Sequence, residues 1–238
     1  MVDSMKFVEK AKIEFENPIV IEAFPGTGLV GSIAGFQIIK DLNLKYFGYF
    51  EVDGILPLTT IEKGIPYPPV RAYANKDFII LFSDIIISPF KINGLAEFIV
   101  KTFSNKNPKL FVSLGGIMAG KSEKVFGIAN KEELIEDLKN YVEIFDFGVV
   151  GGMGGNLLIK CHDNGFDAIG LLAETVGIRP DPRGGANLLE VLNKMFNLNV
   201  NIENLIKEAE AIENKLKELA EQHLKMMSKS RKEYPMYI

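Results

Sequence analysis

The sequence of 238 residues contains no tryptophan and very little cysteine, histidine or arginine. Its single cysteine, Cys161, excludes an internal disulfide and a zinc site built from several thiolates. The two histidines, His162 and His223, stand far apart in the chain, and we expect no metal site. Because arginine is scarce, few side chains are available for bidentate recognition of phosphate or carboxylate groups.

Long hydrophobic runs are absent as well. The most apolar stretch, residues 78–82, is far shorter than the roughly 18 residues that a membrane helix needs. The first fifteen residues carry charges every few positions and lack the apolar stretch of a signal peptide. A net charge of −4 provides no broad attraction to nucleic acid or anionic lipid. We therefore expect a soluble, cytoplasmic protein that binds neither nucleic acid nor membranes.

What the chain does contain is ample material for a folded core, with 47% hydrophobic and 24% charged residues. Short β-branched runs alternate with segments of helical periodicity. Strands are predicted over residues 18–24, 46–52, 70–74, 77–82, 108–114, 124–129 and 167–174, and helices over 29–42, 93–104, 131–140, 157–162 and 186–196. The proline-rich residues 57–69 are predicted to form a loop or a sheet edge. This alternation predicts one α/β domain over residues 1–197, with a mostly parallel sheet flanked by helices.

Residues 198–227 have a different pattern, with apolar side chains three and four positions apart between polar ones. These side chains belong to Ile202, Leu205, Ala209, Ile212, Leu216, Leu219, His223 and Met226. The spacing is typical of an amphipathic helix that packs against another helix, either of its own domain or of a second subunit. Residues 228–238 are polar, contain Pro235 and lack periodicity, which predicts a flexible tail.

A glycine motif follows the first predicted strand and opens the first predicted helix. Gly26, Thr27, Gly28 and Gly31 fit the G-x-G-x-x-G pattern of dinucleotide-binding turns, and Glu51 or Asp53 stands about twenty residues further on. The alternative is a close strand-to-helix turn with no ligand. We favour this structural interpretation, because no second glycine fingerprint and no hydride-transfer pair accompany the motif.

Other candidates for chemistry are weak. Residues 151–155 contain four glycines that suit either a phosphate cradle or a close-packed turn, and the turn is favoured. Asp84 and Glu174 close predicted strands, but acid–base work would require them to be neighbours in space. Cys161 belongs to a Cys-His-Asp run whose adjacent side chains point apart, so it is predicted to be a buried thiol. We expect neither an enzyme nor a cofactor.

The extreme C-terminus has the composition of a recognition element. Met236 is apolar, Tyr237 offers an aromatic ring with a hydroxyl, and Ile238 ends in a free carboxylate that can pair with a lysine. Capture of a C-terminal carboxylate is a recurrent mode of peptide recognition. A flexible tether that ends in such an anchor predicts docking onto another protein.

Several segments in combination resemble the family of proteasome assembly chaperones, in its archaeal homologues. They are FPGTGLVG at 24–31, GILP at 54–57 with the prolines after it, LGG at 114–116, and GGMGG at 151–155 with LLAET at 171–175. The resemblance covers about residues 15–197. It implies a fold like that of purine nucleoside phosphorylase without the nucleoside chemistry, a homo-oligomer, and a glycine turn that is structural.

The resemblance also gives the tail a partner. Met236, Tyr237 and Ile238 are similar to the hydrophobic-Tyr-any-residue (HbYX) motif with which proteasome activators and some assembly chaperones dock between α-subunits of the 20S proteasome. The implied function is that of an ATP-independent assembly chaperone or core-particle binding protein. A nucleotide- or nucleoside-binding enzyme that uses the glycine turn is the alternative.

Overall fold

The computed structural model describes residues 5–121 and 123–207. The strands are β1 (Met5–Glu9), β2 (Ile19–Ala23), β3 (Lys45–Val52), β4 (Thr60–Glu62), β5 (Ile65–Tyr67), β6 (Val70–Ala74), β7 (Phe78–Ser83), β8 (Leu110–Met118), β9 (Val125–Ala129), β10 (Glu143–Ile144) and β11 (Ala168–Thr175). The helices are α1 (Val30–Asp41), α2 (Pro89–Ser104), α3 (Glu132–Leu138), α4 (Gly152–Asp163) and α5 (Pro182–Phe196), and a short 3-10 turn, η1 (Thr27–Leu29), precedes α1.

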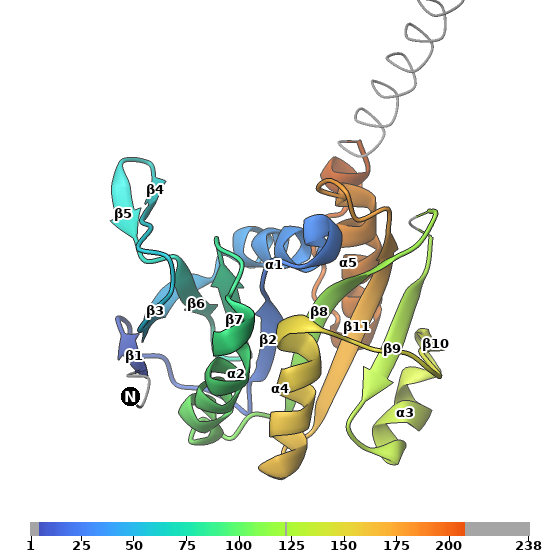
Figure 1. Ribbon diagram of the computed structural model, residues 1–238, viewed down its shortest axis with the longest axis horizontal. Helices are drawn as coiled ribbons and strands as arrows, with labels where there is room; N and C mark the ends of the chain where they lie inside the picture. Colours follow the sequence, from blue (N-terminus) through green and yellow to red (C-terminus); the bar gives the residue numbers. More distant parts are fainter. Residues whose placement is uncertain (1–4, 122, 208–238) are drawn as a thin grey trace, which may run out of the picture.

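Nine of these strands form one sheet in the order β1-β3-β6-β7-β2-β8-β11-β9-β10 (Figure 1). The four central strands, β7, β2, β8 and β11, run parallel to one another. Antiparallel pairings join β1 to β3, β3 to β6, β6 to β7 and β11 to β9. The sheet is therefore mixed, and the prediction of a mostly parallel sheet holds only for its centre. The likeness to purine nucleoside phosphorylase stays a prediction.

The error came from the connections that follow α1. A strand–helix–strand alternation predicts parallel neighbours, but β6 and β7 lie between β3 and β2. Of these two strands, β6 runs antiparallel to both β3 and β7, whereas β7 is parallel to β2. The sequence reasoning also missed β1, a short strand with charged residues at both ends of its apolar pair. Phe7 of β1 packs its ring against Phe47, Phe50 and Phe103, which fixes this edge strand to the core.

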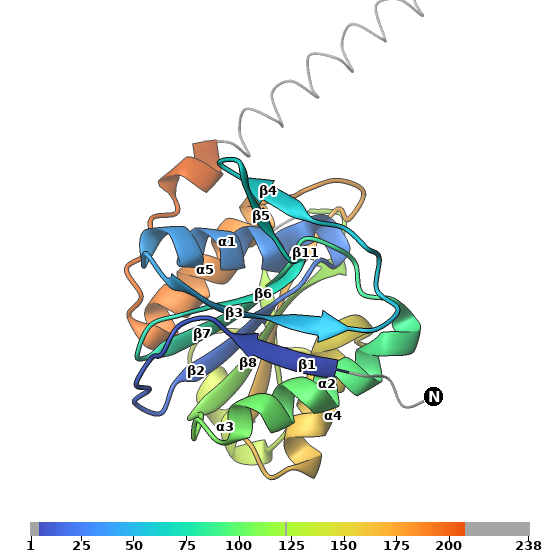
Figure 2. The ribbon, with the colours of Figure 1, turned by 90° about the vertical axis from the view of Figure 1, so that its left-hand side faces the viewer.

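The helices cover both faces of the sheet. In Figure 2, α1 and α5 lie together on one side of the strands, and α2 and α4 lie on the other. The strands at the centre are consequently buried on both faces and mostly apolar, as is typical of parallel strands. None of the helices in the described ranges is long and apolar enough to cross a membrane.

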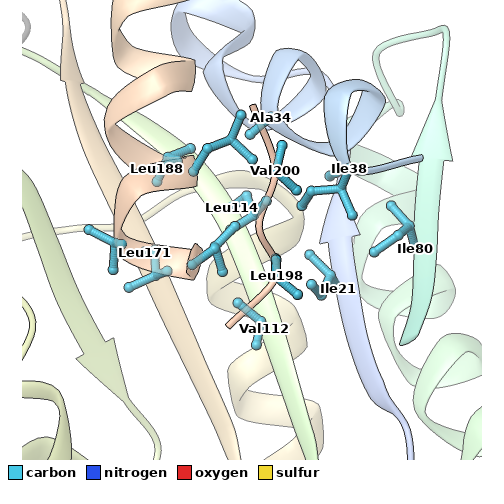
Figure 3. Packing of buried hydrophobic residues seen from close by; sticks show 14 of the residues in the cluster. Ile21, Ala34, Ile38, Ile80, Val112, Leu114, Leu171, Leu188, Leu198 and Val200 are labelled. Carbon is cyan, nitrogen blue, oxygen red and sulfur yellow. The ribbon is translucent and has the colours of Figure 1, made fainter. Parts of the chain in front are cut away.

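The core between the sheet and the α1/α5 layer includes a segment from beyond the predicted domain. Leu198 and Val200 are buried among side chains of β2, β8, α1 and α5 (Figure 3). The side chain of Asn193 holds Val200 through both backbone groups, accepting from its N–H and donating to its C=O at 2.9 Å each. Residues 203–207 are helical, and Leu205 is buried against the same core. The first apolar positions of residues 198–227 thus pack on their own domain, whereas residues 208–227 lie outside the described residues.

The proline-rich residues 57–69 form a small two-stranded sheet of their own, in which β4 and β5 pair as a hairpin. The hairpin is fixed to the main sheet around Arg71, whose side chain is 1% exposed. The guanidinium of Arg71 pairs with Asp84 at 2.8 Å and approaches Glu62 of β4 at 3.6 Å. Its remaining face lies over aromatic rings, including that of Tyr67 in β5.

Replacing this buried cation should therefore destabilise the protein strongly. We expect Arg71→Gln to lower the free energy of unfolding by about 3–5 kcal/mol, because a partly buried Asp84 loses its counter-charge. Denaturant unfolding measures this loss. Lys76→Gln, which removes an exposed ion pair with Glu16, should change the stability little. Equal effects of the two substitutions would contradict this assignment of Arg71.

Candidate functional site

The glycine motif occupies the turn between β2 and α1. Gly28 has φ +64°, and a Cβ at this position would lie 2.3 Å from Oγ1 of Thr175. The neighbouring Leu29 also adopts the left-handed region, with φ 52°. The carbonyl of Gly28 accepts a 2.9 Å hydrogen bond from the backbone N–H of Asp181, so the turn is tied to the segment that opens α5.

Gly31 allows α1 to contact the central strand β8. A Cβ on Gly31 would lie 2.2 Å from the carbonyl oxygen of Leu114, closer than any real Cβ contact. Two glycines of α5 likewise allow this helix to lie close to α1: Gly184 lies against Val30, and Gly185 lies against Ile33. Gly26, by contrast, has open space around its Cβ position and an extended backbone. Packing thus accounts for Gly28 and Gly31, the positions that contact neighbouring elements.

A dinucleotide site would need an acid beside this turn. Glu51 and Asp53 follow the motif at the expected distance in the sequence, but β3 is separated from β2 by β6 and β7. Three strand spacings amount to about 14 Å. The acidic residues therefore do not stand next to the glycine turn as they do in the dinucleotide-binding fold.

The two glycines can be told apart by mutation. We expect Gly31→Ala to lower the free energy of unfolding by several kcal/mol or to prevent folding, because backbone atoms of β8 block the new methyl group. Gly26→Ala should leave the stability within about 0.5 kcal/mol of the wild type. Thermal or denaturant unfolding of both variants checks this difference. A severe loss in Gly26→Ala would show that the turn has a constraint other than packing.

A cavity of about 520 Å³ opens at the carboxyl ends of β2 and β8, beside the start of α4. Gly26 and Thr27 border it, whereas Gly28 and Gly31 do not. Its other walls come from the end of β8 and from the segment that leads into α4. Ligands of α/β proteins bind at this end of parallel strands. The cavity is therefore the candidate binding site in the described part of the chain.

The second glycine segment shapes the cavity's wall. Residues 151–155 were predicted to form a turn ahead of a helix over 157–162, but α4 already begins at Gly152. A Cβ on Gly154 would lie 2.6 Å from Oγ of Ser113, and one on Gly155 would lie 2.5 Å from the carbonyl oxygen of Val150. Gly154 therefore lets the first turn of α4 lie directly on β8, and Gly155 lets the segment that precedes α4 lie close to the same turn.

Glu22 borders the cavity and is 2% exposed. It stands directly opposite Ser113 in the parallel pairing of β2 with β8. Its Oε2 accepts a 2.5 Å hydrogen bond from the Ser113 hydroxyl, and its Oε1 accepts a 2.8 Å bond from the Phe24 N–H. Burial raises the pKa of the Glu22 carboxyl to about 7, and these two hydrogen bonds oppose the rise.

Sequence reasoning did not single out Glu22, although a signal was present. The strand predicted over residues 18–24 has apolar residues on both sides of one carboxylate, and a charge inside a doubly buried strand is unusual. Of the carboxylates that were considered, Asp84 pairs with Arg71, and Glu174 accepts hydrogen bonds from the backbone of residues 123 and 124. They follow β7 and end β11, with β2 and β8 between them, so they do not form an acid–base pair.

Two further expectations concern Cys161 and the C-terminus. Cys161 is buried as predicted, and burial raises the pKa of its thiol to about 12. Met236, Tyr237 and Ile238 lie outside the described residues. Within residues 5–121 and 123–207, no group of three His, Cys, Asp or Glu side chains is placed to hold a metal ion.

The raised pKa of Glu22 predicts how stability depends on pH. The folded state holds this proton more tightly than the unfolded state, whose ordinary value is 4.5. The contribution of the protonated Glu22 carboxyl to the free energy of unfolding is therefore fully present below pH 4.5, and it is lost as the pH rises to about 7. Glu22→Gln keeps the shape and abolishes the titration. We expect the variant to gain about 3 kcal/mol relative to the wild type between pH 4.5 and pH 8, measured by denaturant unfolding.

The matched control is Glu14→Gln, which removes an exposed carboxylate before β2. Its unfolding free energy should follow that of the wild type across the same pH range. A constant difference between Glu22→Gln and the wild type at both pH values would show that Glu22 does not titrate as its burial requires.

The fold and the cavity define an α/β protein with a mixed sheet and a glycine-lined site at the carboxyl end of its central strands. The family profile of the PAC2 family matches residues 20–220. The chain belongs to the PAC2 family, which confirms the resemblance to the proteasome assembly chaperones.

Several known proteins are similar to this chain. The crystal structure of Pyrococcus furiosus PbaA, an archaeal homolog of proteasome-assembly chaperone, matches with a TM-score of 0.84 and 39% identity over 97% of both chains. That of PbaB, a proteasome activator from the same organism, shares the fold with a TM-score of 0.82 at 22% identity, over 91% of this chain and 98% of PbaB. An uncharacterized protein of Methanocaldococcus jannaschii is 31% identical over 88% of this chain and 87% of its own length.

Proposed function

We propose that this protein is an ATP-independent chaperone of proteasome assembly, or a binding protein of the 20S core particle, and not an enzyme. It docks its C-terminal residues Met236, Tyr237 and Ile238 into pockets between proteasome α-subunits. It acts as a homo-oligomer, so that several tails reach one α-ring together.

The observation that carries this proposal is the likeness to PbaA, which extends over nearly the whole of both chains at 39% identity. A match of this extent concerns the domain as a unit and not one shared motif. PbaB is an archaeal proteasome activator with the same fold. These relatives support a role connected with the proteasome, and the tail sequence supplies the mode of contact.

The chemistry of the three tail residues suits a small pocket. The ring of Tyr237 and the side chain of Met236 offer apolar surface, and the terminal carboxylate of Ile238 offers a charge for a lysine. A single tripeptide anchor binds weakly, but linked copies raise the effective concentration, often by a factor of about 10² to 10⁴. Oligomerisation therefore gives weak anchors a useful affinity.

The alternative, a nucleotide- or nucleoside-processing enzyme, needs the glycine turn to hold a phosphate. Gly28 and Gly31 contact neighbouring elements. The acidic residues Glu51 and Asp53 lie about three strand spacings from the glycine turn. Among the described residues that line the cavity there is no lysine, arginine or histidine to balance a phosphate. These observations support the binding protein over the enzyme.

The tail can be tested by a single substitution. We expect Tyr237→Ala to abolish most of the association with 20S α-rings, because an aromatic anchor of a small interface contributes about 2 kcal/mol or more and the loss recurs in every tail. Surface plasmon resonance with an immobilised archaeal 20S particle measures the change. Adding one residue after Ile238 should weaken binding similarly, since it moves the carboxylate.

The control is Tyr234→Ala, which removes the same side chain three positions earlier in the tail. It should bind like the wild type, and both variants should keep the wild-type size in light scattering. Equal binding by Tyr237→Ala and the wild type would refute docking through the tail.

A further inference from the structure

The cavity beside Glu22 has a composition that selects its ligand by charge. Of the described residues that line it, only Glu22 has an ionisable side chain, and Ser113 and Thr27 supply the hydroxyl groups. An anionic ligand would meet a buried carboxyl without a compensating cation, at a high cost in free energy. The cavity therefore suits an uncharged or cationic molecule.

Glu22 is held in a fixed position and retains capacity for further hydrogen bonds. An ionised carboxylate can accept about four hydrogen bonds. Among residues 5–121 and 123–207 two of them are formed, one from the Ser113 hydroxyl and one from the Phe24 N–H. Because the two side chains stand in register on adjacent central strands, their oxygen atoms are fixed by the sheet. N–H donors of a ligand would find acceptors already in place.

The rest of the cavity is mostly apolar or made of backbone. Aromatic, aliphatic and thioether side chains form its walls, and glycines expose backbone groups between them. The apolar side chains include Phe24, Met118, Phe145, Met153 and Leu172. A volume of about 520 Å³ is within the range of sites for small organic molecules. A ligand that fits these walls has a compact apolar body.

We propose that this cavity binds a small organic cation of the amine or amidine type, with an apolar body, and that the carboxylate of Glu22, oriented by Ser113, recognises its N–H groups. The apolar body lies against Phe24 and Met153. The protein thereby has a small-molecule site in addition to its contacts with other proteins.

Benzamidine is a suitable probe, because it combines an amidinium group with a phenyl ring, and benzoate has nearly the same shape with the opposite charge. We expect benzamidine to shift the amide signals of Gly115, Gly152 and Gly154 saturably in a ¹⁵N NMR titration of the full-length protein. The signals of Gly64 and Gly165, which do not line the cavity, should stay in place. Benzoate should produce no saturable shift.

The role of Glu22 is tested by Glu22→Gln, which should weaken benzamidine binding by about tenfold or more, because a charge-assisted hydrogen bond is lost. Glu14→Gln should leave the affinity unchanged. Benzamidine binding that is equal in Glu22→Gln and the wild type overturns the proposal. If the variant does not fold, the wild type decides it: equal affinity for benzoate and benzamidine, or no saturable shift with benzamidine, overturns it. The titration contains no proteasome, so its result is independent of tail docking.

Discussion

The first turn of α1 lies so close to the backbone of β8 that position 31 has no room for a side chain. This contact determines the surrounding structure. It fixes the β2–α1 turn, in which Gly28 adopts a positive φ against Thr175, and it brings α5 in through Gly184 and Gly185. The segment from Phe24 to Thr27, which leads into this contact, forms one edge of the cavity.

On the opposite face of the same strands a glycine again allows a helix to lie close to the sheet, and here the contact involves polar side chains. Gly154 lets α4 lie on Ser113, and Ser113 stands opposite Glu22. A carboxyl buried in this way is costly when ionised, and within the described ranges two hydrogen bonds, from Ser113 and from the Phe24 N–H, offset part of the cost. A protein that needed nothing but a stable core would be better served by an apolar residue at position 22, and the proposed cationic ligand would offset the cost of burying this carboxyl.

The proposed proteasome-related role and the cavity belong to different parts of the chain. The role rests on the relatives and on the last three residues, whereas the cavity lies at the carboxyl edge of the central strands. The chain leaves the α/β domain at a fixed place, because Leu198, Val200 and Leu205 are buried against α1 and α5. Asn193 fastens this exit through two hydrogen bonds to Val200. The starting point of the segment that carries the tail is thereby set by the core.

The sequence by itself determined most of the central elements and the family, because these are properties of local pattern, and from the same kind of pattern it predicts a recognition motif at the C-terminus. Periodicity located β2, β6, β7 and α2, and composition indicated a buried Cys161. Only the tertiary structure decided which strands are neighbours. Strand order depends on long-range packing, so the insertion of β6 and β7 between β2 and β3 could not be read from alternation. The same packing brings Glu22, Ser113 and Gly154 together from three distant segments, and a site formed in this way has no signature within any one of them.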